Sequence, residues 1–297
     1  MTHSEIEAFL AVCRHRKISK AAEELFVSQS SLSIRLKTLE ENLGCPLLQR
    51  GKGKREIALT TQGQAFYSLA LQYQNIIQKM ETVGKGNVLE RLHVSAINSV
   101  GNHLMPPIFE RFTEKYPHIH LTVQDMEAEM ACASILRGKT DLEFSTANVQ
   151  TDQIMATPFL ADPMTVLHSA DLKLPDLVDL EMLLLSNEVY IKWSAEYAYW
   201  HRSVFGADFV PQIELELMGQ IELFVSKPGK WAFVPKSVAD NLCCTSDLRQ
   251  STPAFPIPAR TLYMLRHRDN AETANICCFL DILREVLLER NSEGLLL

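Results

Sequence analysis

The sequence predicts an α/β chain with a mainly helical first segment, and three observations carry this prediction. Residues 19–43 have the pattern of two short helices joined by a tight turn. Residues 61–83 repeat apolar side chains at steps of three and four. From residue 88 onward, strand-like and helix-like segments alternate. We therefore expect a winged helix-turn-helix, then a long linker helix, then a two-lobed α/β body.

The helix pair at 19–43 has one face suited to burial. Ser19 is the expected N-cap of the first helix, and Ala21 and Ala22 let a second helix approach closely. Ser28 is the expected N-cap of the second helix, whose apolar residues are Leu32, Leu36, Leu39 and Leu43. A preceding amphipathic helix would complete a three-helix core with Ile6, Phe9, Leu10 and Cys13.

The other face of the second helix carries hydroxyl, amide and cationic groups that can reach DNA. Gln pairs with adenine, Arg pairs with guanine, and Ser bonds to bases or phosphates. A helix-turn-helix presents the start of its second helix to base edges. The candidate DNA-binding residues here are Ser28, Gln29, Ser30, Ser31, Ser33, Arg35 and Lys37. The alternative is a helical hairpin whose polar face meets only water.

A basic segment follows the helix pair. One acid, Glu56, stands against four cations, and Gly51 and Gly53 favour a hairpin tip. A basic hairpin beside such a helix grips phosphate as a wing. The alternative is an ordinary solvated loop, but the charge balance favours the wing. Its candidate DNA-binding residues are Arg50, Lys52, Lys54 and Arg55.

The long helix at 61–83 is predicted to pair between two chains. Its apolar residues come close to a heptad seam: Phe66, Leu69, Tyr73, Ile76 or Ile77, Met80 and Val83. At 1.5 Å per residue it would span about 35 Å, long for a lone surface helix. The alternative is docking on the chain's own body. Gly84 to Asn87 end the helix and mark a linker.

The body is predicted to form two lobes. The first lobe's segments are strands at 88–97, 118–126 and 141–147 and helices at 103–117 and 130–139. This alternation predicts parallel strands with crossover helices. A second set includes a helix-like stretch at 179–185 and a strand at 260–268, before a final helix that returns to the first lobe. We place lobe I at 88–160 and 268–297 and lobe II at 161–267.

Small-molecule sites in such folds lie beyond the carboxyl ends of the strands. Asn98 and Ser99 follow the first strand, where backbone N–H groups at a helix start suit a carboxylate or phosphate. The candidate ligand residues are Asn98, Ser99, Ser145, Thr146, Trp193 and Ser194. Each by itself is also explained by capping or packing. The aromatic stretch 193–200 fits a core or interface patch better than a ligand site. We expect a small, anionic ligand.

Charge is divided unevenly along the 297 residues, whose formal net charge is −7. Residues 1–86 carry 12 Lys and Arg against 8 Asp and Glu, whereas the remainder carries 17 against 28. The first part is therefore basic and the body acidic, which suits DNA contact by the first part only. At 46% hydrophobic and 22% charged residues, the composition is that of a globular protein.

Several function classes are not supported. No signal-peptide pattern and no apolar run of 18 residues is present, so we expect a cytoplasmic protein without membrane contact. Seven cysteines without C-x-x-C indicate reduced core thiols, with a thiol sensor as the minority alternative. His118 and His120 lack a third ligand nearby, so no metal site is expected. Catalytic motifs and cofactor signatures are missing, so we expect neither an enzyme nor a cofactor. A solute receptor would not explain residues 1–86.

The N-terminal segment resembles the DNA-binding domain of LysR-type transcriptional regulators over about 60 residues. The matching residues are Phe9, Val12, Ser19, Ala21, Ala22, Leu25, Ser28, Gln29, Ser30, Ser33, Leu39, Glu40, Leu43, Gly44, Leu47, Arg50, Leu59, Thr60 and Gly63. Leu48 departs from the family's usual Phe, and the wing is about two residues longer than common. The body resembles the family's effector domain more weakly, at Leu104-Met105-Pro106, Tyr116-Pro117, Gly138, Asp141-Leu142, Pro228-Gly229 and Val234-Pro235.

The resemblance implies a bacterial regulator of transcription that binds double-stranded operator DNA. It implies a periplasmic-binding-protein-like effector domain, a homodimer or homotetramer, and a cleft ligand that alters DNA bending and contact with RNA polymerase. The expected domains are a winged helix-turn-helix at 1–60, a linker helix and hinge at 61–87, and an effector domain at 88–297.

Overall fold

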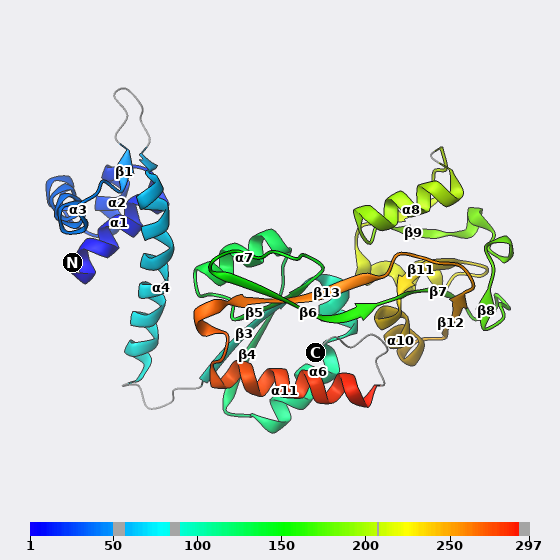
Figure 1. The fold of residues 1–297 in the computed structure, drawn as a ribbon. Coiled ribbons are helices and arrows are strands. Elements are labelled where there is room, and N and C mark those ends of the chain that lie inside the picture. The colour runs from blue at the N-terminus through cyan, green and yellow to red at the C-terminus, as the bar shows by residue number, and fades with distance from the viewer. Residues whose placement is uncertain (50–56, 84–89, 207, 291–297) are drawn as a thin grey trace. The chain divides into compact units, whose positions relative to one another are not determined.

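The computed structural model describes residues 1–49, 57–83, 90–206 and 208–290 (Figure 1). They form two compact units, one with residues 1–88 and 136–139 and the other with residues 89–135 and 140–297. None of the described helices is both long and apolar enough to cross a membrane.

Three helices open the first unit: α1 (His3–His15), α2 (Ile18–Glu24) and α3 (Gln29–Leu43). Their core confirms the predicted three-helix packing and includes Phe9, Leu10, Ala21, Ala22, Leu32, Leu36 and Leu39. Two details were wrong. Lys17, not Ser19, is the N-cap of α2, because the helix begins two residues earlier than predicted. Leu43 is 38% exposed, since α3 ends there against Gly44, whose φ of 68° only glycine adopts easily.

A short hairpin follows, in which β1 (Leu48–Gln49) pairs antiparallel with β2 (Ala58–Leu59). The helix α4 (Thr61–Val83) then has the predicted length. Its apolar residues divide between two faces, so the single predicted seam was too simple. One group packs on the helical core: Phe66, Ala70 and Tyr73. The other is exposed by half or more: Leu69 at 56%, Ile76 at 52% and Met80 at 63%.

Lobe I of the second unit is built on a five-stranded sheet in the order β4-β3-β5-β13-β6. As predicted, β3 (Glu90–Ala96) pairs parallel with both β4 (Ile119–Asp125) and β5 (Leu142–Ser145). The strand β13 (Arg260–His267) pairs antiparallel with β5 on one side and with β6 (Ile154–Asp162) on the other. Between β3 and β4 lie α5 (Asn98–His103) and α6 (Pro106–Lys115).

The core of lobe I lies between the sheet and two helices. The C-terminal helix α11 (Ala274–Glu289) packs on α6, so the chain returns to its first lobe as expected (Figure 1). Four aromatic rings fill this core: Phe112, Phe144, Phe159 and Phe279. On the opposite side of the sheet lies α7 (Ala128–Leu136). Glu143 alternates with Leu142 and Phe144 along β5 and so belongs to the other face.

Lobe II contains a four-stranded sheet in the order β11-β7-β12-β8. Its strands are β7 (Met164–Ser169), β8 (Leu177–Val178), β11 (Trp231–Pro235) and β12 (Leu248–Pro253). A separate parallel pair joins β9 (Val189–Ile191) to β10 (Ile213–Leu215). The helices of this lobe are α8 (Ala195–Phe205), α9 (Ile221–Val225) and α10 (Lys236–Thr245).

Two predictions for the lobes were wrong. The strand at 260–267 belongs to the sheet of lobe I rather than to lobe II, because it pairs between β5 and β6. The helix-like stretch 179–185 forms only short 3-10 turns, because its leucines face outward as well as inward. The aromatic stretch does form core packing, with Tyr197 buried and Trp200 packed on its cluster.

Candidate functional site

The start of α3 presents polar side chains on a fixed helix end. Ser28 accepts a hydrogen bond from the backbone N–H of Ser31 at 3.1 Å, which caps the helix as predicted. Its hydroxyl also lies 2.9 Å from that of Ser30. Gln29 and Ser30 are exposed, and Ser33 is half-buried. The helix is thus anchored through its leucines while its first turn stays open to a partner.

The two predicted cations of α3, Arg35 and Lys37, differ in exposure. Arg35 is half-buried, whereas Lys37 is exposed and pairs with Glu41 at 3.4 Å. Two exposed apolar side chains were not predicted from the sequence, Phe26 at 96% and Ile34 at 65%. Ile34 interrupts the leucine spacing, which was the available signal for it. The four wing candidates Arg50, Lys52, Lys54 and Arg55 lie outside the described residues.

The end of α3 is tied to the β1–β2 hairpin. The carboxylate of Glu40 accepts the backbone N–H groups of Leu47 at 2.7 Å and Leu48 at 3.0 Å. The hydroxyl of Thr60 donates to Pro46 at 2.7 Å and accepts from the N–H of Gly63. A Cβ on that glycine would lie 2.0 Å from a backbone oxygen, so the close approach requires glycine. These contacts hold helix and hairpin in one arrangement.

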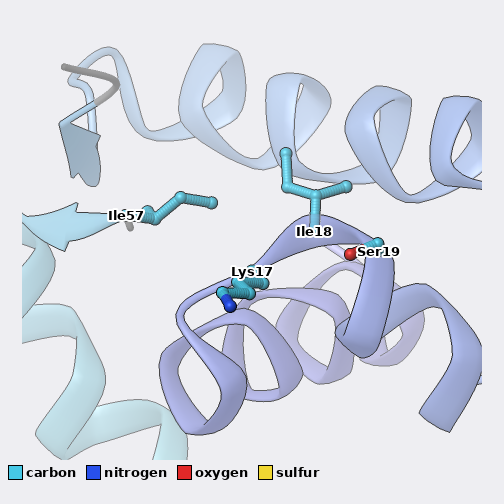
Figure 2. A pocket seen from close by; sticks show the side chains of 4 residues that line it. All are labelled: Lys17, Ile18, Ser19 and Ile57. Carbon is cyan, nitrogen blue, oxygen red and sulfur yellow. The ribbon is translucent and has the colours of Figure 1, made fainter. Parts of the chain in front are cut away.

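This unit has a hollow of about 480 Å³. Figure 2 shows the side chains that line it, Lys17, Ile18, Ser19 and Ile57. Two isoleucines, one ammonium group and one hydroxyl line it. It offers a small molecule few converging polar groups. We assign it no ligand.

The second unit has a hollow of about 340 Å³ at strand ends. Ile97 and Asn98 follow β3, Thr146 follows β5, and Trp193 follows β9. The described residues that line it are Ile97, Asn98, Ser99, Glu127, Thr146, Lys192, Trp193, Glu214, Leu215, Glu216, Met218 and Arg260. Four of the six sequence-predicted residues therefore meet here: Asn98, Ser99, Thr146 and Trp193. We name this hollow the cleft.

The other two candidates do not line the cleft. Ser145 is buried, and its hydroxyl accepts the backbone N–H of Ala147 at 3.2 Å. Ser194 is the N-cap of α8 and accepts the N–H of Tyr197 at 3.0 Å. Both side chains fulfil local capping roles, the alternative that the sequence left open.

Arg260 forms the floor of the cleft and is 7% exposed. Its guanidinium pairs with the carboxylate of Asp162 at 2.9 Å and donates to the hydroxyl of Ser99 at 2.8 Å. Its Cζ atom lies 5.5 Å from the centre of the Trp193 ring, a cation–π distance. Burial lowers the pKa of Arg260, and the adjacent Asp162 charge opposes that shift. The floor therefore contains the buried ion pair of Arg260 and Asp162.

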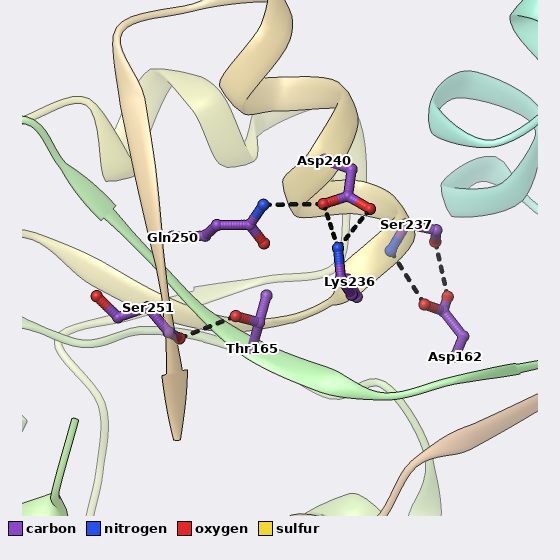
Figure 3. Close-up of polar contacts among 7 residues, drawn as sticks. All are labelled: Asp162, Thr165, Lys236, Ser237, Asp240, Gln250 and Ser251. Atoms are coloured by element: carbon purple, nitrogen blue, oxygen red, sulfur yellow. Dashed lines mark hydrogen bonds and ion pairs between the residues drawn. The ribbon is translucent and has the colours of Figure 1, made fainter. Parts of the chain in front are cut away.

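Asp162 also joins the floor to α10. It accepts the backbone N–H of Ser237 at 3.0 Å and its hydroxyl at 2.7 Å, as Figure 3 shows. Asp162 ends β6 and Arg260 begins β13, so the pair lies where both chain crossings leave lobe I. Asp162 and Arg260 thus lie at the two crossings. Through Ser99 they contact α5 of lobe I, and through Ser237 they contact α10 of lobe II.

Sequence reasoning missed the charged residues of the cleft: Glu127, Lys192, Glu214, Glu216 and Arg260. Arg260 and Asp162 are 98 residues apart, and neither lies in a recognisable motif. Glu214 and Glu216 belong to or directly follow the short strand β10, which has no clear pattern in the sequence. Lys192 directly precedes Trp193, so the strand-end rule that found the tryptophan was the available signal for it.

A helix-turn-helix unit combined with a two-lobed α/β unit is typical of regulators that respond to a ligand. The model of the bacterial regulatory helix-turn-helix proteins of the lysR family matches residues 3–64. The model of the LysR substrate binding domain matches residues 85–288. The chain belongs to the LysR family.

Curated relatives match part of the chain. The uncharacterized HTH-type transcriptional regulator YcgK of Bacillus subtilis is 26% identical over 159 residues, 52% of this chain and 48% of that protein. The chain spans about half the length of the curated relatives it matches.

Two solved structures show the same fold. A full-length OxyR variant from Pseudomonas aeruginosa is 20% identical with a TM-score of 0.63, covering 96% of this chain and 95% of that one. CbnR in complex with its target DNA is 17% identical with a TM-score of 0.57, covering 96% of this chain and 99% of that one.

Proposed function

We propose that this protein is a transcriptional regulator that binds operator DNA sequence-specifically and responds to a small molecule in the cleft. The observation that carries the proposal is the first turn of α3, where Gln29 and Ser30 are exposed on a capped, anchored helix. Such a turn fits the major groove. The described fold resembles that of CbnR, which was solved with its target DNA.

The proposal extends to partners. Leu69, Ile76 and Met80 give α4 an exposed apolar face that suits pairing with a second copy, and a homotetramer would use further surfaces. The effector presents an anionic group to the hydroxyl of Ser99 on the cleft floor. Contact with RNA polymerase and action in the cytoplasm complete the proposal.

Replacing Gln29 with alanine is expected to reduce the preference for cognate over scrambled DNA. If its amide makes a bidentate contact to a base, the loss is about 1–3 kcal/mol. Selection of binding sites from random duplexes identifies the cognate sequence, and titration of both DNAs measures the discrimination.

Gln150→Ala is the matched control, because Gln150 is an exposed glutamine in a loop of the other unit. It should leave both affinities unchanged. An equal loss for cognate and scrambled DNA in Gln29→Ala would assign Gln29 to phosphate contact instead. A wild-type protein with no preference for any duplex would refute the proposed function.

Replacing Ile76 with aspartate is expected to separate paired chains. Burying an ionised carboxylate in an apolar seam costs far more than burying a neutral polar group, so the helices part instead. Sedimentation should show a smaller species, and binding to an operator with two half-sites should weaken.

Gln64→Asp is the control, since it places the same charge at an exposed polar position of α4. Its mass should equal that of the wild type. An unchanged mass for Ile76→Asp, with the second unit still folded, would exclude the exposed face of α4 as the main contact between copies.

A further inference from the structure

The side chains of the cleft offer more acceptors than donors to a ligand. Three carboxylates line it, Glu127, Glu214 and Glu216, and all three residues are exposed at its mouth. Two cations line it, Arg260 and Lys192, but Arg260 is already paired with Asp162. Among the described lining residues, Lys192 is therefore the cation that does not belong to the Arg260–Asp162 ion pair. An anion approaching the mouth meets net negative charge.

A buried acceptor adds to this excess. The amide nitrogen of Asn98 donates to Asp125 at 3.1 Å, which orients the side chain. Its oxygen Oδ1 is then buried and has no hydrogen-bond partner among the described residues. Because buried polar atoms are nearly always hydrogen-bonded, an Asn98 oxygen beside the cleft calls for a donor from a ligand.

The floor has the opposite character. The hydroxyl oxygen of Ser99 accepts an N–H of Arg260, so its proton remains available to donate. An acceptor group of a ligand would therefore lie on Ser99, close to the buried guanidinium. Between floor and mouth, the wall is apolar, with Ile97, Trp193, Leu215 and Met218.

We propose that the cleft takes a zwitterion, whose carboxylate binds Ser99 at the floor and whose ammonium group binds Asn98 Oδ1 and the mouth glutamates. An apolar or aromatic spacer between the two charges would pack against Trp193. This inference rests on the proposed function and deepens it, because it adds a cationic group to the expected anionic effector. The acidic mouth then attracts the ligand and selects against dianions.

Four benzene derivatives test the proposal by calorimetry on the full chain. 4-(Aminomethyl)benzoate carries both charges. 4-Ethylbenzoate replaces its ammonium with methyl, 4-methylbenzylamine replaces its carboxylate with methyl, and 4-(carboxymethyl)benzoate is a dianion. The zwitterion should bind about tenfold more tightly than each of the others, since two charge contacts act together.

Two variants locate the groups. Glu214→Gln combined with Glu216→Gln should weaken binding of the zwitterion by about fivefold, whereas binding of the anion 4-ethylbenzoate should not weaken, because two repelling charges are removed. Ser99→Ala should weaken both carboxylates and spare 4-methylbenzylamine. Glu181→Gln is the control, because Glu181 is an exposed glutamate of lobe II that does not line the cleft.

The proposal is overturned if the dianion or 4-ethylbenzoate binds as tightly as the zwitterion, or if the zwitterion does not bind. It is also overturned if the double glutamate variant binds the zwitterion like the wild type. Binding to cognate and scrambled DNA is measured on the same samples without any probe. Specific DNA binding with failure of the zwitterion refutes this inference and leaves the regulator standing, whereas absent DNA specificity refutes the proposed function itself.

Discussion

Asp162→Asn is expected to destabilise the second unit by about 3–5 kcal/mol, because it leaves the buried charge of Arg260 without its partner. The carboxylate pairs with that guanidinium at 2.9 Å and accepts two hydrogen bonds from Ser237. Its side chain is only 2% exposed, so water cannot replace it. All three tryptophans lie in the second unit, at 193, 200 and 231, and their fluorescence during urea unfolding reports on that unit.

Asp240→Asn is the matched control for this substitution (Figure 3). Asp240 also binds a cation and a polar side chain, Lys236 at 2.7 Å and Gln250 at 2.8 Å, but it is 43% exposed. Removing an exposed pair costs about 0–1 kcal/mol. Similar losses in both variants would contradict the role given to the buried pair.

Glu143→Gln is expected to stabilise the protein increasingly as pH rises from about 5 to about 8. Glu143 is fully buried on β5, accepts a hydrogen bond from Ser95, and its second oxygen has no partner among the described residues. Burial raises the pKa of its carboxyl from 4.5 to about 8. The folded state therefore holds a proton that the unfolded chain has released.

The sign follows from that difference. A pKa raised by folding contributes its full stability below the unfolded value and loses it as pH rises through the folded value. Wild-type stability should thus fall by about 1.4 kcal/mol per pH unit between about pH 5 and 8 relative to Glu143→Gln, which carries no proton to lose. Urea unfolding followed by circular dichroism measures both. Glu129→Gln, at an exposed glutamate of α7, should keep the wild-type slope; parallel profiles for wild type and Glu143→Gln would show that the carboxyl ionises freely.

The local patterns of the sequence predicted the first unit well. Leu32, Leu36 and Leu39 are buried and Ser28 caps α3, because both features depend only on residues within one or two turns. The alternation of strand-like and helix-like segments also predicted the parallel strands β3, β4 and β5. Side chains directly after strands, such as Asn98 and Trp193, were found because the topology brings strand ends together.

The place of strand β13 was beyond the sequence. The strand β13 has the same alternating pattern whichever sheet it joins, so its place between β5 and β6 was not visible. The contact between Asp162 and Arg260 depends on that placement, and no motif marks either residue. The charged residues of the cleft therefore could not be predicted from the sequence, because only the fold brings them together.

The position of β13 also sets an order of events during synthesis. Lobe II is one uninterrupted stretch of chain between β6 and β13, so it has all its strands before the ribosome reaches residue 260. The sheet of lobe I lacks its fourth strand until then, and its core waits for α11 to cover Phe112 and Phe144. Contacts this distant in sequence form slowly, and unfinished cores aggregate. We expect the lobe translated first to mature last, with its aromatic core dependent on chaperones until the final helix emerges.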